Sequence, residues 1–286
     1  MAQHRTMQLS ILNIKIHPHT PDLYHQMFKT AFSRRLVGKI RGVDSGMIGS
    51  FREDQFEEKG VLFGYIFKFL NINPHEKWLN LSNFETIDPL ETGELPVPDT
   101  LKPNLRQIGY VFYPERHRLL FDSTLITPGS ALNFFKRLFG DQSIVSQFGP
   151  VDINIEATHE AIARILSIPQ IKKLVIKFTR PNNDDTAGLE GAIQARIEGQ
   201  NIKRFQQEAS TDEAEGIVPD AETKALMNVA RSNGSVFAMG YDGDEKIEHS
   251  TIDHPIKERM LYYPDLENKT QTMINFSISL IKKFFG

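Results

Sequence analysis

The chain has 286 residues, of which 40% are hydrophobic and 24% are charged, and its formal net charge at pH 7 is −3. This balance is ordinary for a globular protein and excludes wholly disordered, collagen-like and membrane-embedded classes. With no cysteine, the chain has no disulfide, no thiolate nucleophile and no cysteine-based zinc site.

The length favours two closely packed units over a single small domain. The first 18 residues lack the uninterrupted apolar core of a signal peptide, because Lys15 breaks the apolar run. No apolar run approaches the ~20 residues that span a bilayer. We therefore predict a cytoplasmic protein that does not contact a membrane.

Residues 1–72 are predicted to form a βαββ module. The segment MQLSILNIKI alternates as a strand, with Leu9 and Ile11 on one side and Ile14 and Ile16 on the other, and Pro18 ends it. The next segment, LYHQMFKTAFSRRL, has apolar residues at helical spacing. The dense apolar run GVLFGYIFKFLNI indicates a buried strand.

Between the helix and that last strand lies KIRGVDSGMIGSFRED, with several glycines and basic residues. A Walker-type phosphate loop needs Lys and Ser or Thr directly after its last glycine, at the start of a helix. Here Gly49 is followed by Ser50 and Phe51 and then by a strand pattern. We therefore predict a bent hairpin with its turn at residues 44–46, and weigh it above a binding loop.

The rest of the chain divides into three predicted segments. Residues 73–106 form an irregular connection rich in Pro, Asn and acids, and residues 107–181 form a ββαβαβ module. Residues 182–286 form a helical region with a hairpin near 235–250, where Asp242-Gly243 is a strong turn signal. The predicted class is α+β, with two sheet-and-helix modules, ferredoxin-like or related, a helical C-terminal part and a terminal hairpin.

Basic residues cluster in three parts of the sequence, and such clusters are candidates for phosphate contacts. The candidate nucleic-acid-binding residues are Arg34, Arg35, Lys39, Arg41, Lys136, Arg137, Lys172, Lys173, Lys177 and Arg180. The alternative is that lysines guard solvated sheet edges and helix surfaces, which explains most such runs in proteins of balanced charge.

Acidic and histidine residues suggest a second function. A metal-dependent nuclease would need converging carboxylates, and the candidates are Asp44, Glu115, Asp122, Asp184 and Asp185. Glu115 and Asp122 lie at opposite ends of one predicted strand, which favours surface charge instead. His17 and His19 could hold a metal together with Asp22, but we favour surface histidines at a strand end. No metal or other cofactor is predicted.

Five segments carry a resemblance to a known family. They are LNIKIHPHTPDLYHQMF, KIRGVDSGMIGSFRE, LKPNLRQIGYVFYPERHRLLFD, ILSIPQIKKLVIKFTRPNNDD and SNGSVFAMGYDGDEKIEHSTIDHP. Together they resemble a bacterial family of this length described as a domain of unknown function. The layout of the second block is also similar to that of the DNA-binding phage-exclusion protein RexA.

The resemblance implies a non-enzymatic nucleic-acid-binding or assembly component of a phage-defence or mobile-element system. Its expected partners are DNA or RNA, a protein of the same system, and a second copy of the chain. A protein-protein scaffold is a further alternative, because 20 Phe and 7 Tyr residues could supply interface anchors.

Overall fold

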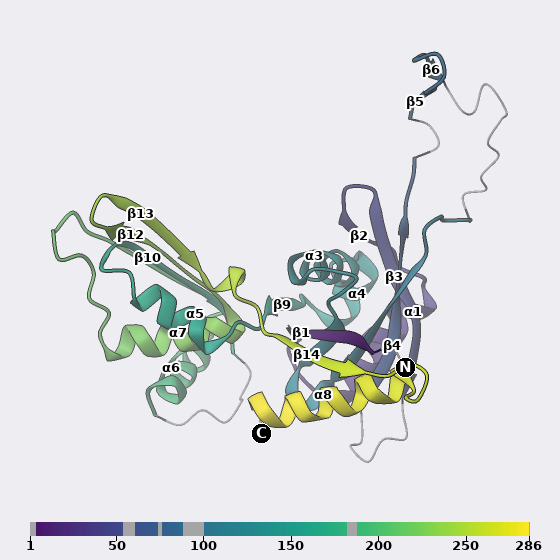
Figure 1. Ribbon diagram of the computed structural model, residues 1–286. Helices are drawn as coiled ribbons and strands as arrows, with labels where there is room; N and C mark the ends of the chain where they lie inside the picture. Colours follow the sequence, from purple (N-terminus) through teal and green to yellow (C-terminus); the bar gives the residue numbers. More distant parts are fainter. Residues whose placement is uncertain (1–3, 54–60, 74–75, 88–99, 182–187, 286) are drawn as a thin grey trace.

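The computed structural model describes residues 4–53, 61–73, 76–87, 100–181 and 188–285 and has two lobes (Figure 1). Each lobe is an antiparallel sheet with helices packed against it. The predicted α+β class with two sheet-and-helix modules is therefore confirmed.

The first lobe is built on an eight-stranded sheet in the described part of the chain. The strand order is β14-β1-β8-β7-β4-β3-β2, and β9 pairs with β1 beyond the end of β14. The strands are β1 (Arg5–Lys15), β2 (Gly38–Arg41), β3 (Asp44–Glu53), β4 (Leu62–Leu70), β7 (Arg106–Tyr113), β8 (Arg118–Asp122), β9 (Asp152–Ile155) and β14 (Lys257–Tyr262).

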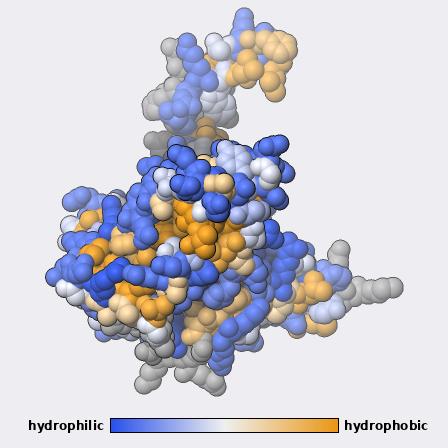
Figure 2. Space-filling view, turned by 90° about the vertical axis from the view of Figure 1, so that its left-hand side faces the viewer, coloured by the Kyte–Doolittle hydropathy of each residue, from blue (hydrophilic) through white to orange (hydrophobic). Residues whose placement is uncertain are grey.

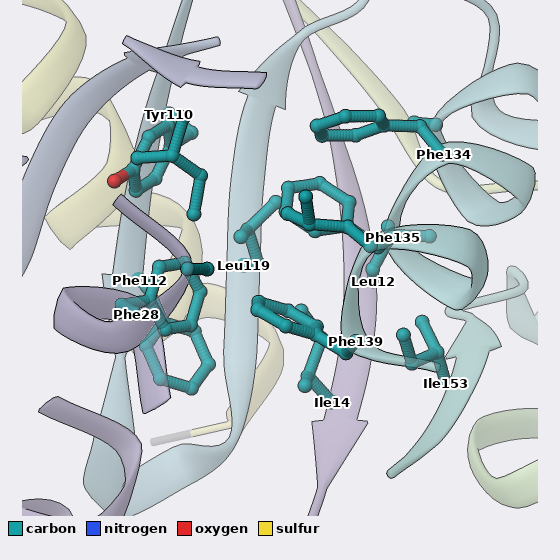
Figure 3. Close-up of a cluster of buried hydrophobic side chains, with 14 of the residues drawn as sticks. Leu12, Ile14, Phe28, Tyr110, Phe112, Leu119, Phe134, Phe135, Phe139 and Ile153 are labelled. Carbon is teal, nitrogen blue, oxygen red and sulfur yellow. The ribbon is translucent and has the colours of Figure 1, made fainter. Parts of the chain in front are cut away.

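Helices cover both faces of this sheet. One face carries α1 (Pro21–Ser33), α3 (Pro128–Phe139) and α4 (Gln142–Phe148), and the other carries α8 (Lys269–Phe285). The α1 and α3 helices each begin with a threonine N-cap followed by proline, a strong local start signal. Figure 3 shows the core beneath them, where aromatic rings of α3 meet aliphatic side chains of the sheet.

One face of strand β1, which lies between β14 and β8, is apolar at its start and polar at its end. Leu9 and Ile11 are buried against the α8 side, but Asn13 and Lys15, which follow with the same alternation, are polar and buried. Asn13 Nδ2 donates to Ser232 O of the second lobe at 2.9 Å. The polar end of β1 therefore meets the second lobe, while its apolar start meets α8.

The second lobe is a four-stranded antiparallel sheet with helices on one face only (Figure 1). Its strand order is β11-β10-β12-β13. Its strands are β10 (Gln170–Thr179), β11 (Arg204–Ser210), β12 (Gly234–Asp242) and β13 (Glu245–Ser250), and its helices are α5 (His159–Leu166), α6 (Gly188–Gly199) and α7 (Ala221–Asn233).

The chain enters and leaves the second lobe through a short neck. Ala157 pairs with Pro255 in an isolated antiparallel bridge. On either side, Thr158 N donates to His254 O at 3.0 Å and Ile256 N donates to Glu156 O at 2.8 Å. The second lobe is thus an insertion between β9 and β14, which lie along the same edge of β1.

Several predicted elements can be checked. The hairpin at Asp242-Gly243 is confirmed between β12 and β13, and Gly243 has φ of 59°. The hairpin after α1 is also confirmed, but its turn was misplaced: the chain turns at Gly42, with φ of 55°, and residues 44–46 already belong to β3. Glycine is needed there because a positive φ costs other residues more.

The segment around 204–210 was wrongly predicted to be helical. It forms β11, which pairs with β10. Without β11, β10 would be an unprotected edge strand of the sheet. Within residues 73–106, the described part contains a short strand pair, β5 (Trp78–Leu79) and β6 (Thr86–Ile87), far from both sheets (Figure 1). The remaining short elements are η1 (Pro114–Arg116) and η2 (Thr251–Asp253).

The sheets also draw on distant parts of the sequence. The β10 strand, at the end of the predicted 107–181 segment, pairs with β11 and β12 from the 182–286 segment. The β14 strand and α8 then return to the first lobe.

Candidate functional site

A pocket of about 310 Å³ lies where α3 of the first lobe faces the second sheet. Both lobes contribute to its wall, through α3 and β9 on one side and β10, β11, β12 and η2 on the other. The lining residues are Leu132, Lys136, Asn154, Ile155, Lys177, Phe178, Thr179, Arg204, Phe205, Gln206, Asn233, Gly234, Ser235 and Ile252.

The pocket is cationic. Lys136, Lys177 and Arg204 come from three different elements, all three are exposed, and none makes an ion pair with another residue in the described ranges. The described lining contains no carboxylate. The lining therefore presents three cations and no carboxylate, with Glu208 of β11 next to the wall near Lys177, and this excess of cations favours an anionic ligand.

Strand alternation explains why the cations of the second sheet reach the pocket. Ile176 and Phe178 point into the helix-covered core, so Lys177 and Thr179 point to the opposite face. The sheet register places Arg204 opposite Thr179 and Ser235 opposite Lys177. These side chains therefore share the face that α3 approaches with Lys136.

A buried cation stands behind the pocket wall. Lys15 is fully buried, and its Nζ donates to Asn233 Oδ1 at 2.8 Å, to Arg180 O at 2.8 Å and to Thr179 Oγ1 at 3.2 Å. Thr179 and Asn233 themselves line the pocket. Lys15 therefore ties together two residues of the pocket wall, Thr179 and Asn233.

An amide donor also lines the pocket. Asn154 Nδ2 is buried and has no hydrogen-bond partner among the described residues. Its cross-strand neighbour Asn13 donates to the second lobe. The Oδ1 atom of Asn13 is also buried and accepts no hydrogen bond from the described residues. A donor without a partner is costly when buried, and a ligand oxygen would satisfy it.

Burial and nearby positive charges lower the pKa values of two histidines close to this region. Burial, followed by the charges of Lys15 and Arg180, lowers the pKa of His17. His117 lies beside His19, with ring centroids 4.0 Å apart, and its Nδ1 lies 3.2 Å from the Tyr24 hydroxyl. Burial, and next the proximity of His19, lower the pKa of His117 to about 2. His117 is therefore a neutral, packed residue at neutral pH.

The open face of the second sheet continues from the pocket. On β12, Phe237, Met239 and Tyr241 alternate with the core residues Val236 and Ala238 and are half-buried. Figure 2 views the molecule from the side of this lobe and shows hydrophobic surface enclosed by hydrophilic residues. The open face thus combines partly exposed aromatic rings with the cations of β10.

The chain matches the family described as Domain of unknown function (DUF4747) over residues 5–278, which is nearly its whole length. The chain belongs to this family. Among curated proteins, none matches it. The family description assigns no activity, so the site must be judged by its geometry. Within the residues that the structure describes, no helix is both long and apolar enough to span a bilayer.

The predicted basic residues of this DUF4747 member are distributed over several surfaces. Lys136 and Lys177 meet in the pocket. Lys173 lies on the same open face and pairs with Glu208 at 2.5 Å. Arg180 pairs with Glu198 at 2.7 Å, and Lys172 donates to Glu213 O.

The other predicted cations do not line the pocket. They are Arg34 and Arg35 after α1, Lys39 and Arg41 on β2, and Arg137 on α3. The sequence therefore identified two of the pocket cations but not the set that converges there.

The candidate nuclease residues do not form a metal site in the described chain, which has no group of three His, Asp or Glu side chains placed to hold an ion. Asp44 pairs with Lys68 at 2.8 Å, and buried Asp122 pairs with Lys269 at 3.2 Å. Strands β7 and β4 lie between the strands that carry these two acids, so the acids are separated by at least about 14 Å across the sheet. Glu115 is in η1, and Asp184 and Asp185 lie outside the described residues.

Sequence reasoning missed three residues of the site. Arg204 was in the segment mistaken for a helix, so its face could not be assigned. Asn154 lies in a short strand without a distinctive motif. Lys15 did leave a signal, because a lysine between Ile14 and Ile16 in an apolar run needs a specific partner when it is buried.

Proposed function

We propose that this protein binds DNA or RNA and that the pocket between α3 and the second sheet holds backbone phosphate. The observation that carries the proposal is the convergence of Lys136, Lys177 and Arg204 on a wall without a described carboxylate. We place this activity in a bacterial phage-defence or mobile-element system of the cytoplasm, as a non-enzymatic component. That setting is supported only by the layout similarity to RexA noted from the sequence.

Electrostatics favours a local and not a global mode of binding. The net charge of −3 gives no overall attraction to a polyanion, so affinity must come from a confined positive region. Three exposed cations and the Asn154 amide together supply charge and directed donors. Phosphate oxygens accept from such groups without regard to base sequence.

The salt dependence of binding tests this proposal. Each cation that contacts a phosphate contributes about 0.7 to 0.9 to the slope of log affinity against log salt. Lys136→Gln, Lys177→Gln and Arg204→Gln combined should reduce that slope by about 2 to 3 and weaken binding to every sequence alike. Fluorescence anisotropy with labelled single-stranded and duplex probes measures both quantities.

A matched control is available on α1. Lys29 is exposed and does not line the pocket, so Lys29→Gln should leave the slope unchanged. No binding by the unmodified protein at low salt would remove the proposal. Equal salt slopes for the unmodified protein and the triple variant would show that the nucleic-acid interface lies outside the pocket.

A further inference from the structure

Resting on the proposed function, we infer that the ligand is single-stranded and that its bases stack on Phe237 and Tyr241 of the open sheet face. The second sheet has helices on only one face, so the opposite face is available to a ligand. Phe237 and Tyr241 lie on β12, which is one of the two central strands. Their side chains share that open face because Val236 and Ala238 point into the core.

The register surrounds Phe237 with side chains suited to a nucleic acid. Val175 of β10 lies opposite Phe237, and Lys173 and Lys177 flank Val175 on the same face. Diagonal neighbours in an antiparallel pair are about 7 to 8 Å apart, within reach of long side chains. Lys173 is paired with Glu208, which lies opposite Val175, so Lys177 is the cation that a base stacked on the ring would have within reach of its phosphates.

The base-binding face and the phosphate pocket are continuous. Ser235 precedes Phe237 by one alternation on β12, lines the pocket and lies opposite Lys177. Tyr241 extends the same row in the other direction, opposite Lys246 of β13. A strand running along β12 would place phosphate in the pocket and bases on the two aromatic rings, which lie about 13 Å apart along β12.

Aromatic rings on an open sheet select single strands for a physical reason. The faces of the bases are covered by their neighbours in a duplex, whereas unpaired bases offer them for stacking. A four-stranded antiparallel sheet with helices behind it and aromatic residues in front is a known platform for such binding. Charge complementarity with the adjacent pocket favours this occupant over a second copy of the acidic chain.

The test compares a single strand with a duplex of the same sequence. Phe237→Leu and Tyr241→Leu should each weaken single-strand binding roughly five- to hundredfold, which is the value of one stacked base. Neither should change the salt slope, because no phosphate contact is removed. Duplex affinity should stay the same. Phe237→Tyr should restore stacking, and Tyr263→Leu, at an exposed aromatic after β14, is the matched control.

The outcomes separate this inference from the function it rests on. Single-strand and duplex binding of equal strength, unaffected by both leucine variants but weakened by the triple pocket variant, would overturn base stacking alone. A change of oligomeric state in Phe237→Leu, measured by light scattering, would instead identify this face as a protein interface. No binding of either probe by the unmodified protein would overturn both proposals. Thermal melting of each variant shows whether it is folded, and Tyr241→Leu serves if Phe237→Leu is not.

Discussion

A buried ion pair of the first lobe lies where the second lobe meets it, and its removal gives the sharpest stability prediction. Arg118 Nε on β8 lies 2.7 Å from Glu156 Oε1, which follows β9, and their side chains are 3% and 0% exposed. The pair is close but not aligned as a hydrogen bond. Ser232 Oγ of α7 donates to the other carboxylate oxygen at 2.8 Å. The guanidinium also lies 4.6 Å from the ring centre of Phe285 on α8.

The expected cost follows from burial. Removing one member of a buried pair leaves the other charge uncompensated, which costs about 3–5 kcal/mol. We therefore expect Arg118→Met or Glu156→Met alone to lower the free energy of unfolding by that amount. The double variant removes both charges of the pair and leaves Arg231 as the remaining buried charge beside this position, so its loss should be well below the sum of the two single losses.

Urea unfolding of the four proteins measures the free energies that make up this cycle. The control is Lys246–Glu248, a pair of similar length, 2.6 Å, whose side chains are 56% and 50% exposed. Lys246→Met should cost far less than either single variant of the buried pair, because solvent screens the Lys246–Glu248 pair. Additive losses in the double variant, or a Glu156→Met loss as small as the Lys246→Met loss, would refute the reasoning.

Two further changes test the packing. Because the pKa of His117 is lowered to about 2 in the folded protein, only the unfolded chain takes up this proton as pH falls through its ordinary value of 6.5. Stability should therefore fall by about 2 kcal/mol between pH 7 and pH 5, and His117→Asn, which tolerates the positive φ of 56°, should remove that part of the loss. Urea midpoints at the two pH values check this, and an equal loss in both proteins would contradict it. Gly64→Ala should destabilise by about 1–3 kcal/mol or more, because a Cβ there would lie 2.1 Å from Ser50 O. A thermal midpoint equal to that of the unmodified protein would show that β4 shifts without cost.

Local signals predicted much of the fold. Apolar residues at helical spacing identify α1 and α3, and Asp242-Gly243 identifies the β12–β13 hairpin. The polar segment that became β11 has no such signal, because its strand conformation depends on the free side of β10. The intrinsic preference of this segment for a strand is weak, so its pairing with β10 determines its conformation.

The candidate site was harder to predict for a related reason. Lys136 is on α3 and Lys177 on β10, in different lobes, and only the folded chain shows that they face one pocket. Lys15 reaches Asn233, which is 218 residues away along the chain. Periodicity assigns each residue to a face of its own element, but it does not say which faces meet.

The neck at Ala157 and Pro255 bears on how the chain reaches its native state. About 100 residues separate these two positions, and closing so long a flexible loop costs about 4 kcal/mol of chain entropy. If the inserted lobe folds first, its two ends already lie close together. The entropy cost of closing the loop has then been met before β9 and β14 pair with β1. We therefore expect the inserted lobe to act as a template for the late assembly of the larger sheet. Adjacent ends are also the geometry that allows one module to be acquired within another during evolution.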